Sequence, residues 1–364
     1  MSRRIAFVAM FILACFSMIS YAQTNFTDDQ IRSILKEQME LKKIPGIAVG
    51  IIDQHGKKII CEGKLDKKKD LEPDSNTLYE IGSITKVFTS LILQEMADRG
   101  KLDIHDPISK FLPESVKTPT KDGKEITLLD LSSQISGLPR MPTNFAPADY
   151  SNPFADYTPE KLYEFLSSYK LTRGIGEKYE YSNVGVGLLG YILSLVEGTD
   201  YETLVHKYVC DPLNMKSTFV SITPEFKKRL ATGYNAGGYT VKNWDFSALP
   251  GAGALKSSVN DLLIFLEANL GLVKTKLLPA MEKIRQARHD TGVPDLDIAM
   301  GWHIWKKFNE KIIWHNGGTA GYRTFIGFNN ENKKGVVVLS NSSASVDDIG
   351  LHLLDDRYEL RYQK

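Results

Sequence analysis

Hydrophobic and polar residues follow different periods along the chain, and the first segment has the period of a helix. Residues 27–42 carry apolar side chains at helical spacing, and a capping-box pattern opens the segment at Thr27. Two apolar runs at residues 47–52 and 58–61 then flank His55-Gly56, an arrangement typical of a β-hairpin. We therefore predict a helix followed by two paired strands.

The middle of the chain has mainly helical periodicity. A helix is expected from about Thr85 to Arg99, and Gly100 ends it. Few strand patterns occur between residues 101 and 250, where a proline-rich loop covers residues 136–156. Further helices are predicted to begin at Thr158-Pro159 and to cover residues 184–196 and 201–210.

Strand-like runs return toward the end of the chain, after a capped helix at about residues 258–270. Four such runs alternate with turns, and a last helix is expected over about residues 346–362. The strand-like runs cover residues 301–305, 312–315, 322–328 and 335–339.

Strands therefore occur at both ends of the chain and helices in its middle. This order predicts an α+β fold, with one antiparallel sheet built from the N- and C-terminal segments and covered by the first and last helices. A mainly helical domain is inserted between the two ends. We place the α/β subdomain at about residues 23–105 and 255–364, and the helical subdomain at about residues 106–254.

Composition narrows the class of protein. The chain has 364 residues, of which 42% are hydrophobic and 24% charged, as in an ordinary globular protein with a sizeable core. Lys and Arg number 45 against 44 Asp and Glu, a formal net charge of +1. This balance gives no electrostatic basis for binding nucleic acid or an anionic membrane.

Residues 1–22 have the pattern of an export signal. Arg3 and Arg4 precede a nearly unbroken apolar run, and Ala22 ends a stretch of small residues suited to signal peptidase. We expect cleavage after Ala22, a periplasmic or secreted mature protein, and no membrane association after signal removal. A retained anchor and a lipoprotein attached through Cys15 are the alternatives, although the apolar residues after Cys15 argue against a lipobox.

Cys61 and Cys210 remain in the mature chain, and neither belongs to a CxxC motif. Export would permit a disulfide between them. Both lie in apolar surroundings, which favours buried free thiols.

The first candidate for chemistry is Ser83-x-x-Lys86 at the start of the Thr85 helix. Residues three apart share a helix face, so the hydroxyl and the amine can meet. The first turn of a helix also offers unpaired N–H groups, which suits a serine that attacks a carbonyl and must stabilise an oxyanion. The same spacing occurs at Ser33 and Ser167, where we expect ordinary helix surfaces.

Tyr181-Ser182-Asn183 is the second candidate, since a tyrosine hydroxyl beside a lysine amine can relay a proton. Asn183 could hold the lysine or a substrate amide. Residues 150–152 repeat the same three letters. We prefer the copy at residues 181–183 because it opens a helix, whereas Tyr150 lies in the proline-rich loop.

His315-Asn316-Gly317-Gly318 is the third candidate, at the end of a predicted strand. Two glycines permit a close backbone approach, and the Gly318 N–H could complete an oxyanion hole with that of Ser83. Trp244 and Phe246 could line the pocket or pack locally.

The string GxGxxG at residues 185–190 lacks the preceding strand and the βαβ unit of a dinucleotide site, so we interpret it as small residues in a closely packed helix.

The three motifs follow one another in the order found in the serine β-lactamase and penicillin-binding protein superfamily: Ser83-x-x-Lys86, then Tyr181-x-Asn183, then His315-x-Gly317. The chain resembles most closely its class C β-lactamase branch, with the D-alanyl-D-alanine carboxypeptidase and esterase relatives. Pro45-Gly46 and Ser136-Gly137-Leu138-Pro139 fit the same resemblance, which covers essentially the whole mature chain.

The resemblance implies that Ser83 is the acylated nucleophile, with Lys86 and Tyr181 as the proton-transfer pair; which of the two is the base stays open. The substrate-binding residues would be Asn183, His315, Asn316, Gly317 and Gly318. His315 stands where most class C β-lactamases have lysine, and Asn316 and Gly318 replace residues that carry hydroxyls. These departures bear on how a substrate carboxylate is bound.

The sequence thus predicts an exported serine hydrolase that acts on a β-lactam or a D-alanyl-D-alanine-type amide and needs neither metal nor organic cofactor. An esterase, or a carboxypeptidase that β-lactams inhibit, is the alternative. A catalytically silent binding or sensor domain is a more distant one. We expect a monomer.

Overall fold

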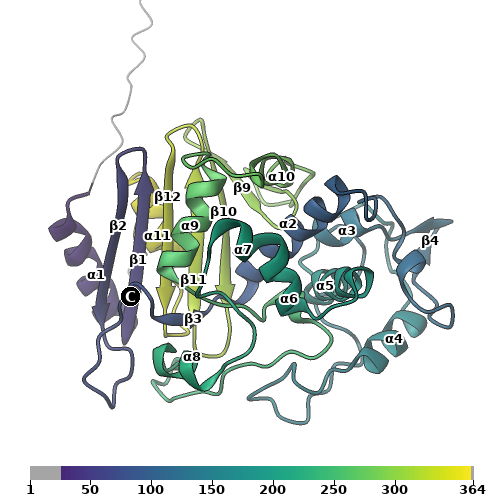
Figure 1. Ribbon diagram of the computed structural model, residues 1–364, viewed down its shortest axis with the longest axis horizontal. Coiled ribbons are helices and arrows are strands. Elements are labelled where there is room, and N and C mark those ends of the chain that lie inside the picture. The colour runs from purple at the N-terminus through teal and green to yellow at the C-terminus, as the bar shows by residue number, and fades with distance from the viewer. Residues whose placement is uncertain (1–25, 362–364) are drawn as a thin grey trace, which may run out of the picture.

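The computed structural model describes residues 26–361 of the chain. Within these residues, eight strands form one antiparallel sheet in the order β2-β1-β12-β11-β10-β9-β8-β7 (Figure 1). The strands are β1 (Gly46–Asp53), β2 (Gly56–Gly63), β7 (His289–Asp290), β8 (Leu296–Ile298), β9 (His303–Lys307), β10 (Glu310–Gly318), β11 (Arg323–Asn329) and β12 (Lys334–Ser340).

The two ends of the chain meet inside this sheet. β1 lies beside β12, with Ile47 opposite Ser340 and Ile52 opposite Gly335. The predicted α+β fold, with one antiparallel sheet contributed by both ends, is confirmed.

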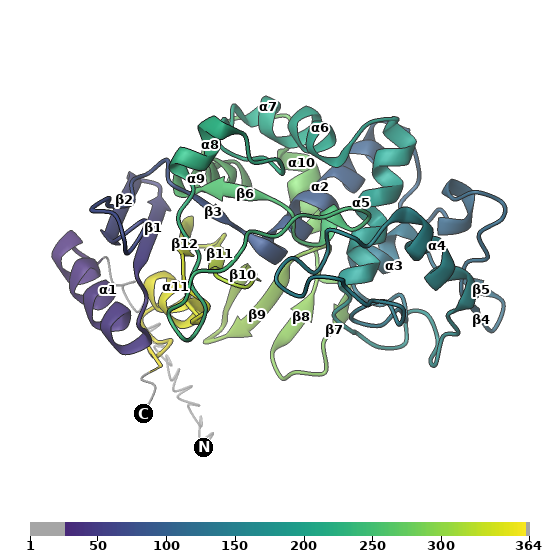
Figure 2. The same cartoon turned by 90° about the horizontal axis from the view of Figure 1, so that it is seen from below.

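Helices cover both faces of the sheet, as Figure 2 shows. α1 (Asp28–Lys42) and α11 (Asp347–Leu354) lie on one face, and α2 (Thr85–Asp98), α9 (Val259–Asn269) and α10 (Leu278–Ile284) lie on the other. Alternate side chains of the strands therefore enter two separate cores. In β12, Val336 and Val338 pack with α1 and α11, whereas Val337 and Leu339 pack with α2 and α9.

Most of the remaining helices lie in the helical part beside the sheet in Figure 1, whereas the last of them lies below the sheet in that view. They are α3 (Leu128–Ser132), α4 (Pro159–Ser168), α5 (Asn183–Glu197), α6 (Tyr201–Val205), α7 (Asp211–Leu213) and α8 (Pro224–Arg229). Two short strand pairs join β3 (Leu78–Glu80) to β6 (Lys256–Ser258) and β4 (Thr120–Lys121) to β5 (Lys124–Glu125).

α5 contains the GxGxxG string, and two of its glycines pack closely against residues 249–251. A Cβ on Gly190 would lie 2.8 Å from the Cα of Gly251, and a Cβ on Gly187 would lie 2.7 Å from Leu249. The interpretation as a closely packed helix is confirmed.

Other sequence expectations need correction. The last helix ends at Leu354 and does not reach the neighbourhood of residue 362, because Asp355 is extended and ties its carboxylate to Arg357. The helix expected over residues 201–210 becomes a π-helical turn from His206 onward. Strands β7 and β8, of two and three residues, were not predicted.

The predicted export signal lies outside the described residues. Between residues 26 and 361, no helix combines the length and the apolar character that crossing a bilayer requires. Cys61 and Cys210 are both free, as expected; Cys210 is buried and Cys61 half-buried.

Candidate active site

Ser83 lies in a tight turn between β3 and α2, within a 3₁₀ segment, Gly82–Ile84. Gly82 has φ of +50°, and a Cβ there would lie 2.6 Å from the Gly318 nitrogen. A Cβ on Gly317 would lie 1.9 Å from the Ile81 carbonyl oxygen. Glycine is therefore required on both segments, because the turn that carries Ser83 and the end of β10 touch through backbone.

Lys86 follows one turn later on α2 and is fully buried. Its Nζ lies 2.9 Å from Ser83 Oγ, 2.9 Å from Asn183 Oδ1 and 2.6 Å from the carbonyl oxygen of Ala252. Burial lowers the pKa of the Lys86 amine well below its ordinary value, and the nearby Arg140 guanidinium lowers it further.

Tyr181 and Asn183 reach Ser83 from the start of α5. Ser182 caps the helix by accepting the Gly185 N–H at 2.9 Å, and its hydroxyl donates to the Pro139 carbonyl at 2.7 Å. The Tyr181 ring lies 4.8 Å from Lys86 Nζ. Burial raises the pKa of the Tyr181 phenol, and a hydrogen bond with Ser83 opposes that rise.

The competing copy of the motif lies elsewhere. The Tyr150 side chain is 82% exposed, and Asn152 is bonded to Asp245. The structure therefore brings Ser83, Lys86, Tyr181 and Asn183 together and leaves Tyr150 outside the cluster.

His315 lies behind the Ser83 cavities and does not line them. It is 1% exposed, with Nδ1 2.5 Å from the Asn316 carbonyl oxygen, and its ring centroid lies 6.3 Å from that of Tyr181. Burial, followed by the neighbouring His303 and Lys86, lowers the pKa of His315 well below its ordinary value. The imidazole is therefore neutral at pH 7, unlike a lysine at the same place.

His303 on β9 is a site residue that the sequence did not reveal. Its ring centroid lies 5.1 Å from that of His315, and its Nε2 lies 3.1 Å from the Tyr179 hydroxyl. Burial lowers the pKa of His303 to about 4. The two neutral histidines pack against each other at a tilt of 46°, and His315 in turn packs against Tyr181.

A polar cavity of about 430 Å³ opens on one side of Ser83. It is bordered by three of the predicted segments and by two arginines that were not predicted. Its lining comprises Ser83, Arg140, Tyr181, Trp244, His303, Asn316, Gly317, Gly318, Thr319 and Arg323.

A second cavity, of about 310 Å³, lies on the Asn183 side of Ser83, and its lining includes four aromatic side chains as well as Met141 and Arg140. Phe154 stacks on Phe246 with centroids 4.6 Å apart, and both border this space together with Phe145 and Trp244. Trp244 and Phe246, for which two interpretations stayed open, thus line the site.

Two buried side chains of opposite charge hold the backbone of Trp244 in this wall. Glu80 accepts the Trp244 N–H at 2.8 Å, and Lys256 Nζ donates to the Trp244 carbonyl at 3.1 Å. Glu80 and Lys256 face each other across β3 and β6. The strand that precedes Ser83 therefore also fixes the aromatic side of the site.

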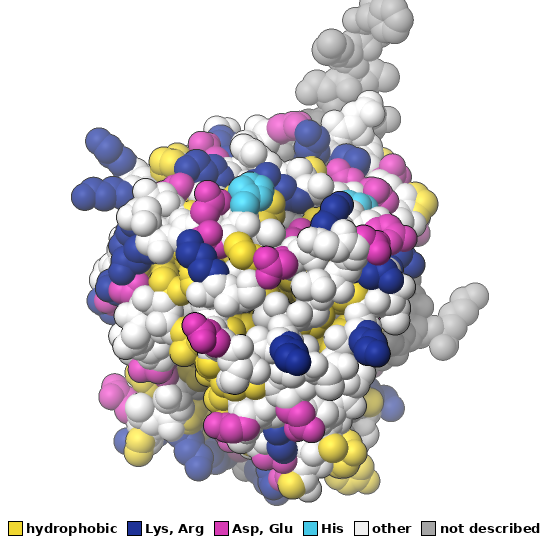
Figure 3. Space-filling model, turned by 90° about the vertical axis from the view of Figure 1, so that its right-hand side faces the viewer, with side chains coloured by type: hydrophobic (Ala, Val, Ile, Leu, Met, Phe, Trp, Pro, Cys, Tyr) yellow, Lys and Arg dark blue, Asp and Glu magenta, His cyan; other side chains and the backbone are white. Residues whose placement is uncertain are grey.

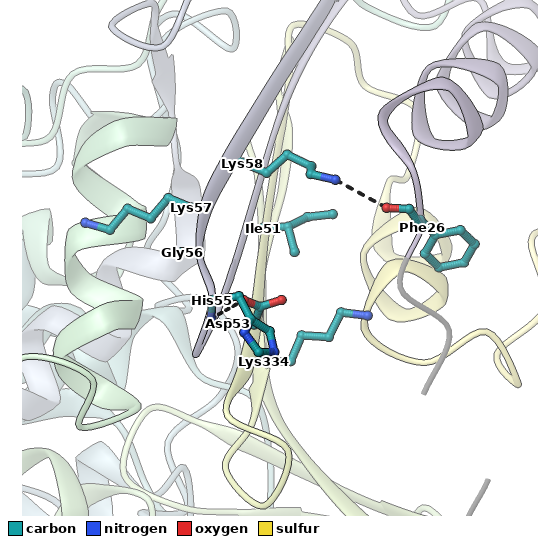
Figure 4. Close-up of a pocket in the computed structure, with 8 residues that line it drawn as sticks. All are labelled: Phe26, Ile51, Asp53, His55, Gly56, Lys57, Lys58 and Lys334. Carbon is teal, nitrogen blue, oxygen red and sulfur yellow. Dashed lines mark hydrogen bonds between the residues drawn. The ribbon is translucent and has the colours of Figure 1, made fainter. Parts of the chain in front are cut away.

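A further pocket lies at the other side of the molecule, between the β1–β2 hairpin and the start of α1 (Figure 4). Lys58 donates to the Phe26 carbonyl there at 3.3 Å, and Lys334 is nearly buried. No serine borders this pocket among its described lining residues. Within residues 26–361, no group of three or more His, Cys, Asp or Glu side chains is placed to hold a metal ion.

The sheet, the inserted helices and the Ser-Lys-Tyr-Asn cluster have the arrangement that the three sequence motifs predicted. Residues 31–357 match the family model described as Beta-lactamase, and the chain belongs to this family.

Two individual proteins are also similar to this chain in sequence. The beta-lactamase of Providencia stuartii is 29% identical over 266 residues, covering 73% of this chain and 66% of that protein. The D-alanyl-D-alanine-carboxypeptidase/endopeptidase AmpH of Escherichia coli K12 is 26% identical over 343 residues, covering 90% of this chain and 88% of that protein.

The octameric penicillin-binding protein homologue from Pyrococcus abyssi superimposes with a TM-score of 0.79 at 27% identity, covering 90% of this chain and 77% of that one. This chain spans about two thirds of the length of the Providencia protein.

Proposed function

We propose that this protein is a serine hydrolase that forms an acyl-enzyme on Ser83, with β-lactams or D-alanyl-D-alanine-type amides as substrates. The observation that carries the proposal is the environment of Lys86. A buried amine 2.9 Å from Ser83 Oγ, bonded to an amide oxygen and a carbonyl, has no carboxylate beside it within residues 26–361 to keep it charged. Such a lysine can be neutral near pH 7 and can take a proton.

In the proposed acylation, Ser83 Oγ bonds to the substrate carbonyl carbon as its proton passes to Lys86. The backbone N–H groups of Ser83 and Gly318 hold the oxyanion. The C–N bond then breaks, and Tyr181 relays the proton to the leaving nitrogen. Asn183 orients Lys86 and the substrate amide. Water hydrolyses the ester in a second cycle of the same groups.

His315 would act through its neighbours in this mechanism. Buried and neutral, it packs against the Tyr181 ring and accompanies Asn316, which lies at the edge of the polar cavity. We propose that it positions Tyr181 and the end of β10 for substrate, while Asn316, Gly317 and Gly318 contact substrate directly.

The relatives support this assignment, since one is named a beta-lactamase and another a carboxypeptidase/endopeptidase. An esterase of the same fold is the second candidate, favoured by the aromatic cavity, which suits an apolar acyl group. A silent binding domain is disfavoured by the complete Ser-Lys-Tyr-Asn cluster.

We further propose export with cleavage after Ala22, subdomains at the boundaries given above, and a monomer. Charged side chains of both signs intermingle on the face seen in Figure 3.

The test is the intact mass of the mature protein at successive times after mixing with a penicillin, beside a Ser83→Ala control. An adduct that forms and clears within seconds supports a β-lactamase cycle, and one that persists for minutes supports an inhibited peptidase. With no adduct and no Ser83-dependent turnover of p-nitrophenyl esters, the hydrolase proposal fails.

A further inference from the structure

Tyr181 reaches the site from an extended segment just before α5. The Glu180 N–H donates to the Gln134 carbonyl at 2.9 Å, and the Ser182 N–H donates to Gln134 Oε1 at 2.6 Å. Alternate N–H groups that bond the same residue are typical of extended chain, in which side chains two residues apart point to one side. Tyr179 and Tyr181 therefore lie on the same side of this segment.

Two histidines face these two tyrosines. The Tyr179 hydroxyl is hydrogen-bonded to His303 Nε2 at 3.1 Å, and the Tyr181 ring centroid lies 6.3 Å from that of His315. The centroids of the two imidazoles are 5.1 Å apart, and the histidines come from the adjacent strands β9 and β10. Tyr179 thus ties the segment to the sheet, two residues before the tyrosine that would relay the proton.

The hydrogen bond between Tyr179 and His303 joins two uncharged groups. Burial raises the pKa of the Tyr179 phenol to about 12 and lowers the pKa of the His303 imidazole to about 4, so both are neutral near pH 7. His303 Nδ1 is buried and has no hydrogen-bond partner within residues 26–361. The Tyr179 hydroxyl is therefore the one partner of this imidazole in the described chain, and its loss would leave a buried polar ring unsatisfied.

The pair lies beside the reacting atoms without reaching them. His303 borders the polar cavity but is only 8% exposed, and Tyr179 is not among the residues that line either cavity beside Ser83. Any effect of the pair on the reaction must therefore pass through Tyr181, whose hydroxyl would protonate the leaving group.

We propose that Tyr179 and His303 form a positioning pair that holds the Tyr181 hydroxyl in place for proton delivery to the leaving group. The inference rests on the proposed acyl-enzyme function and adds two residues to it. A general acid must lie within hydrogen-bond distance of the atom that it protonates, and a displacement of about 1 Å can cost about 10²-fold in rate. Gln134 fixes the segment through its backbone, and the pair fixes the side that faces the sheet.

The experiment uses leaving groups that need the proton to different extents. In a series of esters with one acyl group, the leaving group changes from p-nitrophenol to phenol to trifluoroethanol, in order of rising pKa, and kcat/KM is measured for each. Tyr181→Phe should make kcat/KM fall more steeply along the series, because poor leaving groups depend most on the acid. Tyr179→Phe and His303→Phe should steepen it in the same way, with a loss of about 10-fold on the trifluoroethyl ester and less than about twofold on the p-nitrophenyl ester.

Three further variants separate positioning from general damage. His303→Gln keeps a polar partner for the Tyr179 hydroxyl and should recover part of the loss. The double variant Tyr179→Phe/His303→Phe should be no worse than the poorer single variant, because both changes remove the same bond. Tyr163→Phe is the matched control, since it removes a hydroxyl that bonds Tyr191 and borders neither cavity, and its dependence on the leaving group should equal that of the wild type.

Equal losses on every ester in Tyr179→Phe would show a structural role and overturn the inference, as would a wild-type dependence in that variant or losses that multiply in the double variant. These outcomes leave the proposed function intact if turnover still requires Ser83. A Tyr181→Phe variant with the wild-type dependence would overturn both the relay and the inference. Turnover that persists in Ser83→Ala would instead overturn the proposed function itself.

Discussion

Lys86 and Lys256 are both buried, yet their surroundings give them opposite tasks. Lys256 faces the Glu80 carboxylate across β3 and β6, and its Nζ donates to two backbone carbonyls, those of Val220 and Trp244. Lys86 contacts a hydroxyl, an amide oxygen and a carbonyl, and the charge that acts on it comes from another cation, Arg140.

Burial lowers the pKa of both lysines, but the opposing carboxylate acts on only one. Glu80 raises the pKa of Lys256 against the effect of burial, so that lysine can stay charged and hold the wall of the site. Among the described residues, no carboxylate raises the pKa of Lys86 in the same way. A compensated lysine serves as a structural tie, whereas an uncompensated one is available for proton transfer.

The largest expected effect is that of Lys86→Met. Removing the base should slow acylation of Ser83 by about 10³-fold or more, within the range for general bases. Stability should be unchanged or higher, because an amine buried without an opposite charge beside it is costly to keep. Intact-mass kinetics and urea unfolding measure the two quantities, and strong destabilisation with normal acylation would reverse the assignment.

Next in size is the effect of Tyr181→Phe, which should slow acylation by about 10²-fold because the proton relay is lost. Tyr150→Phe is the matched control, and its exposed side chain predicts a change of less than about twofold. A severe loss in the Tyr150 variant with a normal Tyr181 variant would mean that the wrong copy of the motif was chosen.

Glu80→Gln tests the other half of the comparison. It removes the carboxylate charge that opposes the effect of burial on the Lys256 pKa, and we expect a loss of about 3–4 kcal/mol in the free energy of unfolding. The double variant Glu80→Gln/Lys256→Met should recover part of this loss, since the uncompensated charge is gone. A double variant as unstable as the single one would show that the pair acts through packing alone.

The smallest expected effect concerns His303, whose pKa burial lowers to about 4. The unfolded chain binds a proton at this residue near pH 6.5, so folding becomes less favourable as pH falls from about 6.5 to about 4. The full difference is about 3 kcal/mol. His303→Asn should flatten this part of the stability curve, measured by urea unfolding at several pH values. An unchanged slope between those pH values would contradict the burial of a neutral imidazole.

Much of the fold could be read from periodicity because its main elements are long and amphipathic. β12 alternates between two cores, and α1 begins at a capping box that the structure reproduces at Thr27. Strands of two or three residues, such as β3 and β7, are too short to show a period. The charged segment after Leu354 contains apolar residues at helical spacing, which extended the predicted helix too far.

The motif residues could be predicted because their chemistry depends on spacing, either within one helix turn or at the start of a helix. Arg140, His303 and Arg323 could not, since a single arginine or histidine on a loop or strand is ordinarily a surface residue. His303 and Arg323 lie on the two strands that pair with β10, and Arg140 lies on a loop where its carbonyl accepts the Asn183 N–H. Which of their side chains reach Ser83 depends on how the sheet and the helical part pack together, and the sequence does not give that packing. Arg323 follows Gly318 by five residues, which is the one local signal that the sequence offered.

The contact between the Ser83 turn and the end of β10 also decides when activity can first appear during synthesis. Gly82 meets Gly318, and β1 completes its pairing with β12, so neither the nucleophile nor its sheet is finished until the last strands have been made. Such non-local pairings form late in folding. In the proposed mechanism, a nascent chain therefore carries Ser83 for most of its synthesis without the Gly318 N–H, and hydrolysis begins with the closure of the C-terminal strands.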